Sequence, residues 1–212
     1  MKSFVVFGYG VPKDILKDEN YGRYLSAVFN RIYDLAAGEH ALVIFTGGPT
    51  ECRPPFKRTE AGEMAKLFKK LVGRAPVKAA AKKWKYVLEK KALSSVENSL
   101  YSRQYLKKIC PVVFFCEHTR AKRDMIVAKK VFKGFKPAVV GIDFDMSSNR
   151  YIDKKFLRRK ENKALKVDLA ALKDKKFLKE YIDWNKRKLK FLRKNYKKDH
   201  AKMVEKWWRQ NL

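Results

Sequence analysis

Five short apolar runs along the chain predict buried β-strands. Four of them are rich in β-branched and aromatic residues and are apolar at every position rather than at every second one, a pattern typical of parallel strands covered on both faces. These four runs are residues 4–7, 41–45, 112–115 and 138–142, and a weaker fifth candidate is 84–89. We therefore expect one parallel sheet of about five strands.

The segments between these runs have helical periodicity. Apolar side chains recur on a single face of residues 21–37, as in an amphipathic helix. Thr59 is placed to cap a second helix, Ser94 and Glu97 have the spacing of a capping box at the start of a third, and residues 120–132 predict a fourth. The alternation of strands and helices predicts an α/β, Rossmann-like, three-layer fold.

The pattern changes near residue 150. From Lys154 onward the chain contains no glycine or proline and shows long helical stretches that are rich in lysine and aromatic residues. We therefore divide the chain into a Rossmann-like domain, residues 1–150, and a basic helical extension, residues 151–212, packed on or beside it. Its aromatic residues have two interpretations: a core that packs against the domain or a second subunit, or a nucleic-acid surface in which rings alternate with lysine and arginine.

The charge of the chain is strongly positive. The formal net charge is +29, and the extension holds 22 lysines and arginines against 8 acidic residues, a net charge of +14. A field of this sign attracts polyanions such as nucleic acid. A general preference for lysine throughout the chain is the alternative explanation, because lysine occurs in nearly every predicted helix.

The cysteines and apolar runs indicate a soluble, cytoplasmic protein. Cys52, Cys110 and Cys116 have neither metal-ligand spacing nor the pattern of a disulfide framework, so we expect reduced thiols and no metal site. The apolar run Phe4–Phe7 is too short for a signal-peptide core, and no run reaches the roughly 20 apolar residues of a membrane span.

Glycines follow the first two strands, where ligands bind in open α/β sheets. Gly8 follows the first strand, and Gly47 and Gly48 follow the second, so backbone amides could approach an anion closely there. The first turn lacks the third glycine of a dinucleotide fingerprint, and the chain has no GxxxxGK[ST] loop. A standard NAD site and a P-loop are therefore excluded, and the cofactor remains unidentified.

Polar residues cluster at the ends of the later strands. His118, Arg120 and Arg123 leave an apolar strand and open a helix; histidine titrates near neutrality, and arginine has the geometry to hold phosphate or carboxylate. Ser95 and Asn98 could reach the same cleft, although helix capping is the alternative role for Ser95. We predict a site for an anionic, nucleotide-like or phosphorylated small molecule.

The roles in this site follow from side-chain chemistry. Arg120 and Arg123 would hold the anion, while Glu60 or Glu89 would act as a base or orient a ribose. His118 is the third candidate catalytic residue. Such a site could support hydrolase or transferase chemistry, but the sequence leaves open whether the protein is an enzyme. The alternative function is a nucleic-acid-binding module that uses residues 151–212, and the oligomeric state is undetermined.

The order of these motifs resembles the YdcF/SanA/ElyC-like family, the domain of unknown function 218, over roughly residues 3–145. The resemblance implies a Rossmann-like sheet with polar residues around a cleft above the strand ends. Many bacterial members are membrane-anchored and linked to the cell envelope, whereas this chain has no predicted anchor. The residues that carry the resemblance are Gly47, Gly48, Glu60, Ala61, Glu89, Ser95 and Asn98.

This sequence departs from the family pattern at three places. Ala92 stands where the family has serine, and Ser95 stands where it has threonine. The family's His-x-x-Arg-Ala element aligns in two ways, with either Arg120 or His118 at the histidine position. The resemblance therefore leaves open which side chain would take the role of that histidine.

Overall fold

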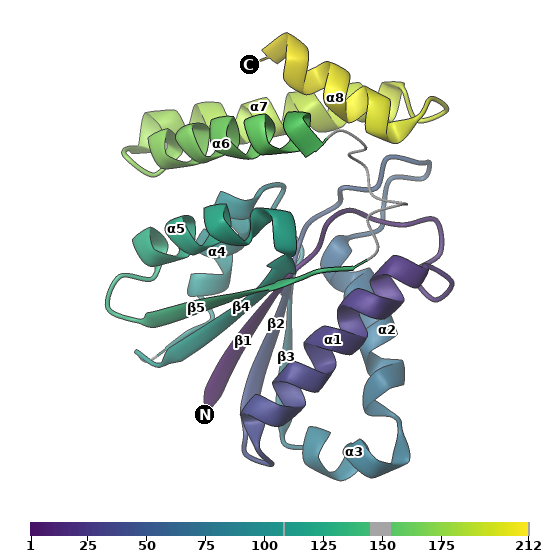
Figure 1. Ribbon diagram of the computed structural model, residues 1–212, viewed down its shortest axis with the longest axis vertical. Helices are drawn as coiled ribbons and strands as arrows, with labels where there is room; N and C mark the ends of the chain where they lie inside the picture. Colours follow the sequence, from purple (N-terminus) through teal and green to yellow (C-terminus); the bar gives the residue numbers. More distant parts are fainter. Residues whose placement is uncertain (108, 145–153, 212) are drawn as a thin grey trace.

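In the computed structural model the chain forms one five-stranded, all-parallel sheet (Figure 1). The structure describes residues 1–107, 109–144 and 154–211. The strands lie in the order β3-β2-β1-β4-β5, so the predicted Rossmann-like parallel sheet is confirmed. Their bounds are β1 (Lys2–Phe7), β2 (Ala41–Thr46), β3 (Trp84–Glu89), β4 (Pro111–Glu117) and β5 (Lys136–Ile142).

Helices cover both faces of the sheet. Helices α1 (Glu19–Ala36) and α2 (Glu60–Val72) lie on one face, and α4 (Ser95–Arg103) and α5 (Ala121–Val131) lie on the other. A short helix, α3 (Ala75–Ala81), connects α2 to β3 and was not predicted. The layers bury two cores on opposite faces, because alternate side chains of each strand point to opposite sides.

The two cores show why the strand sequences are continuously apolar. In β1, Phe4 and Val6 pack with α1 and α2, while Val5 and Phe7 pack against Phe132 at the end of α5. Every position of β2 is buried. A strand that faces helices on both sides needs an apolar residue at each position.

The predicted capping residues lie at the starts of α2 and α4, as expected. The Thr59 side chain accepts a hydrogen bond from the Gly62 amide at the start of α2, and Ser94 accepts one from the Glu97 amide at the start of α4. The Glu97 carboxylate in turn accepts a hydrogen bond from the Ser94 hydroxyl, at 2.8 Å. These contacts satisfy amides that have no partner inside the helix.

The extension forms three helices that lie across the carboxyl ends of the strands (Figure 1). They are α6 (Lys154–Ala171), α7 (Lys175–Lys194) and α8 (His200–Asn211). Ala171 and Tyr181 pack with Val96 of α4 and Val127 of α5, and Trp207 and Trp208 lie in a cluster between the extension's own helices. The boundary placed between residues 150 and 151 lies outside the described residues.

The packing explains the tryptophans of the extension as core residues, whereas Phe177 and Tyr196 are exposed. Trp207 and Trp208 are 8% and 7% exposed, and the Trp184 ring lies 5.1 Å from that of Trp208.

Within the described ranges, no helix is long and apolar enough to cross a membrane.

Candidate ligand-binding site

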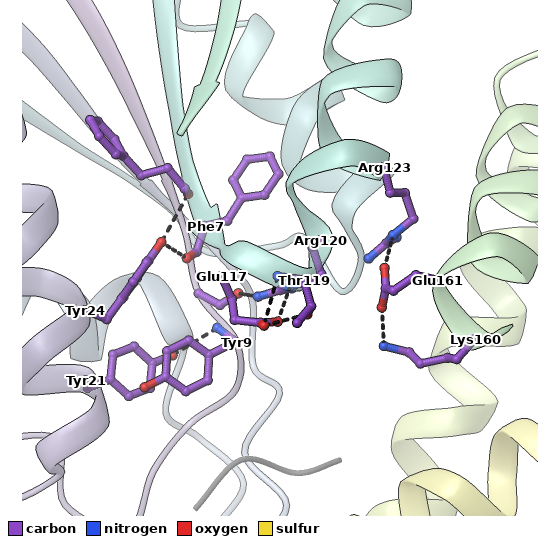
Figure 2. Close-up of polar contacts among 12 residues, drawn as sticks. Phe7, Tyr9, Tyr21, Tyr24, Glu117, Thr119, Arg120, Arg123, Lys160 and Glu161 are labelled. Atoms are coloured by element: carbon purple, nitrogen blue, oxygen red, sulfur yellow. Dashed lines mark hydrogen bonds and ion pairs between the residues drawn. The ribbon is translucent and has the colours of Figure 1, made fainter. Parts of the chain in front are cut away.

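The site lies where the order of the strands reverses in the sheet, between β1 and β4. Open α/β sheets bind ligands at such a switch point, because the two adjoining loops turn toward opposite faces. Here the Gly8 carbonyl, directly after β1, accepts a 3.0 Å hydrogen bond from Arg120 Nη2, directly after β4 (Figure 2). The predicted Gly8 and Arg120 therefore meet at one point.

Tyrosines hold the diverging ends of β1 and β4. The Tyr24 hydroxyl lies 2.7 Å from the Phe7 carbonyl and 3.1 Å from that of Phe115 (Figure 2). Burial raises the pKa of Tyr24 well above its usual value, so its proton is retained as a donor. The Tyr21 hydroxyl accepts a 3.1 Å hydrogen bond from the Tyr9 amide. The sequence pattern placed Tyr24 on an apolar helical face and did not indicate this polar role.

Arg120 is a partly buried cation, with its side chain 15% exposed, and it has donor capacity left over. Its Nε lies 3.6 Å from the Glu117 carboxylate, too far for a hydrogen bond, and this buried Nε–H has no hydrogen-bond partner among the described residues. Burial acts to lower the pKa of Arg120, but the negative charges of Asp124 and Glu117 outweigh it and raise the pKa. Arg120 therefore remains charged at any physiological pH.

A cavity of about 380 Å³ opens beside Arg120, within the range of small-molecule sites. Its floor comes from the strand ends and its roof from the extension. The predicted residues in its lining are Gly8, Glu60, Ser95, Asn98, Arg120 and Arg123. The roof includes Lys160, Val167, Trp184, Lys188, Tyr196, His200 and Trp208. Sequence reasoning missed these roof residues, because nothing in their pattern indicates which end of the sheet the extension covers.

Gly8 and Gly47 make room for Glu60 rather than for a ligand. A Cβ at Gly8 would lie 2.3 Å from Glu60 Oε2, and one at Gly47 would lie 2.6 Å from Glu60 Cβ. Gly47 also has φ +146°, which side chains with a Cβ rarely adopt. The Glu60 carboxylate accepts a 2.6 Å hydrogen bond from Thr50, so the two glycines seat this carboxylate at the cavity wall.

The first turn of α2 has no amide left for an anion. The amides of Glu60 and Ala61 donate to the carbonyls of Gly48 and Gly47, at 3.1 and 3.0 Å. A Cβ at Gly48 would lie 2.7 Å from the Ala92 carbonyl, so this glycine lets two loops meet. Gly47 and Gly48 lie outside the cavity lining.

Glu89 organises the loop that leads into α4. Its carboxylate accepts hydrogen bonds from the Thr46 hydroxyl, at 2.7 Å, and from the Lys91 amide, at 2.6 Å. The same Thr46 hydroxyl lies 3.0 Å from Asn98 Oδ1. Glu89 is 2% exposed and lies outside the cavity lining, whereas Asn98 and Ser95 reach the cavity from the first turns of α4.

His118 lies outside the cavity, and Arg123 is already paired with carboxylates of α6. His118 is exposed beside β5, where a Cβ at Gly141 would lie 3.2 Å from its Nδ1, and it does not line the cavity. Arg123 Nε lies 2.7 Å from the Glu161 carboxylate (Figure 2). Its Nη1 lies 2.8 Å from the carboxylate of Asp168. Arg123 therefore joins α5 to α6, although one side of it borders the cavity.

Two lysines of the extension flank an indole ring in the roof. Lys160 Nζ lies 5.7 Å from the centre of the Trp208 ring, and Lys188 Nζ lies 5.3 Å from it, within cation–π range. Lys160 also lies 2.6 Å from the Glu161 carboxylate. The extension therefore adds positive charge to the side of the cavity opposite Arg120.

Metal ligation finds no support in the described ranges, where no three histidine, cysteine, aspartate or glutamate residues come together in a metal-binding arrangement. No family model, curated protein or solved structure matches this chain. The resemblance to the YdcF/SanA/ElyC-like family therefore rests on its motifs alone.

Proposed function

We propose that the cavity binds an anionic small molecule, nucleotide-like or phosphorylated, with its negative group against Arg120. The proposal rests on the N–H donors of Arg120 that remain for a ligand. A guanidinium has five N–H donors, and within the described parts of the chain Arg120 makes one hydrogen bond, to Gly8. Phosphate and carboxylate match the remaining donors in geometry and charge.

The surroundings of Arg120 support a ligand of this class. The cavity lining includes the positively charged Arg53, Lys160 and Lys188 together with the rings of Trp184 and Trp208. Cations and aromatic walls together suit a molecule with a phosphate at one end and a flat ring at the other. The first turn of α4 adds Ser95 and Asn98 as polar contacts.

Among the three candidate catalytic residues, Glu60 is the one in the cavity lining. A hydrolytic or transfer reaction in this cavity would therefore use Glu60 as its base. The binding proposal does not depend on such a reaction. A Glu60→Gln variant that binds ligand but loses product formation would assign the role.

Isothermal titration calorimetry tests the proposal, after thermal-shift measurements with inorganic phosphate, mononucleotides and sugar phosphates select a ligand. We expect Arg120→Gln to weaken binding of that ligand by roughly tenfold to a hundredfold, because a hydrogen bond to a charged group contributes about 1.5–3 kcal/mol. Arg31→Gln is the matched control, since Arg31 is exposed on α1 and lies outside the cavity lining.

Two results would overturn the proposal. One is the absence of binding to the wild-type protein by every member of the panel at millimolar concentration. The other is equal affinity of the Arg120→Gln and Arg31→Gln variants, which would place the anion elsewhere on this basic protein.

A further inference from the structure

Helix α6 carries its acidic residues on its buried side and most of its lysines and arginines on its exposed side. Both of its acidic residues, Glu161 and Asp168, are buried. Its exposed cations are Lys155, Arg158, Arg159, Lys163 and Lys166, and exposed Lys173 follows just after its end. The two signs therefore lie on opposite sides of one helix, and within the described residues the outer side carries no carboxylate of α6.

The spacing of these cations places them on one face. Arg159, Lys163 and Lys166 are separated by four and three residues, as are neighbours along a helix surface. The buried stripe Leu157, Ala164 and Ala171 repeats every seven residues on the opposite side. From Lys155 to Lys166 the face extends about 16 Å at 1.5 Å per residue.

The neighbouring helices enlarge this positive surface. Helix α7 packs alongside α6 (Figure 1) and exposes Lys176, Lys179, Lys186, Lys190 and Lys194 at helical spacing. Over the described residues of α6–α8 and their connections, 18 exposed lysines and arginines stand against 3 exposed acidic residues. This excess far exceeds what solubility requires.

We infer that the outer face of α6, with the cations of α7 beside it, binds the phosphodiester backbone of double-stranded nucleic acid without reading its sequence. Phosphate contacts by lysine and arginine supply such sequence-independent affinity. Single strands are bound largely by stacking of bases on aromatic rings, but here Trp184, Trp207 and Trp208 pack inward. The exposed rings of the extension's described side chains, Phe177 and Tyr196 at 45% and 39%, lie outside α6, so the charged ridge of α6 fits a duplex better.

An anionic membrane fits this face less well. Helices that lie in a membrane interface bury an apolar side in the lipid, whereas the apolar side of α6 packs on its own protein through Leu157, Ala164 and Ala171. No large hydrophobic residue is exposed among the described side chains of α6. The described side chains of α6 therefore offer charge but no large hydrophobic residue for insertion.

The test measures binding of the full chain to a fluorescent DNA duplex of about 20 base pairs while salt is raised from about 50 to 200 mM. The test variant carries Arg158→Gln, Arg159→Gln and Lys166→Gln. Its matched control carries Lys66→Gln, Lys69→Gln and Lys70→Gln on α2, where the side chains are also exposed. Both variants lose three positive charges, and circular dichroism checks that both remain folded.

We expect the α6 variant to bind roughly tenfold or more weakly and to reduce the slope of log K against log salt by about 3, or about 0.9 per lost phosphate contact. The α2 control should keep the wild-type slope, and unrelated duplex sequences should bind alike. The inference is overturned if the two variants weaken binding equally, or if the wild-type protein does not bind duplex at about 50 mM salt. Binding to vesicles that contain phosphatidylserine but not to duplex would also overturn it, in favour of a membrane partner.

Discussion

Arg123 Nη1 on α5 lies 2.8 Å from Asp168 Oδ2 on α6, and this contact joins the sheet domain to the extension. Glu161 pairs with the same guanidinium, and the Tyr181 hydroxyl donates to Asp168 at 2.8 Å. Burial raises the pKa of Tyr181 well above its usual value, so the hydroxyl keeps its proton. The cluster is largely buried, although Arg123 and Asp168 border the cavity. Its positive and negative charges are paired only when the extension is docked.

Replacing Arg123 should therefore destabilise the whole molecule. In Arg123→Met the carboxylates of Glu161 and Asp168 remain buried without their partner, and such a loss costs about 3–5 kcal/mol. Urea unfolding followed by tryptophan fluorescence measures the change. Lys186→Met, at an exposed pair with Asp183, should change stability by less than about 1 kcal/mol. A comparable small loss in Arg123→Met would show that the cluster is not a stabilising link.

The same cluster should make stability depend on acid. Burial acts to raise the pKa of Glu161, but the charges of Arg123 and Lys160 outweigh it and lower the pKa to about 2. Its folded pKa is thus below its unfolded value, so its stabilisation is present above about pH 4.3 and is lost as the pH falls through about 2. Burial raises the pKa of Asp168 despite Arg123, which has the opposite sign and offsets part of the loss.

Glu161→Gln isolates this contribution. Between about pH 5 and pH 2 the wild-type protein should lose up to roughly 3 kcal/mol more stability than the variant, because the pKa of Glu161 is about 4.3 in the unfolded chain and about 2 in the folded protein. Urea unfolding at each pH gives both curves. Parallel curves for the two proteins would contradict the assigned role of Glu161.

A glycine after a strand and a glycine in a helix give opposite predictions. Gly47→Ala forces a positive φ on alanine and drives its Cβ into Glu60, so we expect a loss of about 3 kcal/mol or more. Gly22→Ala, in the first turn of α1 with no atom within 4 Å of the new Cβ, should instead gain about 0.5–1 kcal/mol. Thermal unfolding compares the two, and a well-tolerated Gly47→Ala would contradict the packing described for Glu60.

Arg193 on α7 should limit the opening of the loop after β2. Its guanidinium donates to the carbonyls of Pro49 and Glu51, at 2.6 and 3.0 Å, and lies over the Phe56 ring at 5.0 Å. We expect Arg193→Ala to increase amide hydrogen exchange in residues 49–58 and to cost about 1.5–3 kcal/mol. Lys194→Ala, exposed on the same helix, is the control and should leave exchange in this loop unchanged.

Local features of the fold were predictable because their causes are local. The apolar strands and the caps at Thr59 and Ser94 depend on residues within one turn or one run, and their positions are confirmed. Helix α3 was missed, because a short alanine-rich segment has little periodicity to detect.

The site was predictable only in outline. Strand ends bring Gly8, Asn98 and Arg120 together through the topology of any parallel sheet. By contrast, the partner of a glycine or an arginine is set by distant segments: Glu60 fills the space beside Gly47, and Glu161 and Asp168 occupy the donors of Arg123. The roof of the cavity depends in the same way on where the extension docks.

Glu161 and Asp168 are buried because α6 is docked on the sheet domain. The electrostatic potential at the outer face of α6 therefore depends on the tertiary structure. If α6 were detached, both carboxylates would return to water and would neutralise part of the field around the helix. Docking withdraws them into contact with Arg123 and leaves the cations outside. The potential at the outer face is therefore a property of the assembled protein, stronger than that of the extension as an isolated peptide.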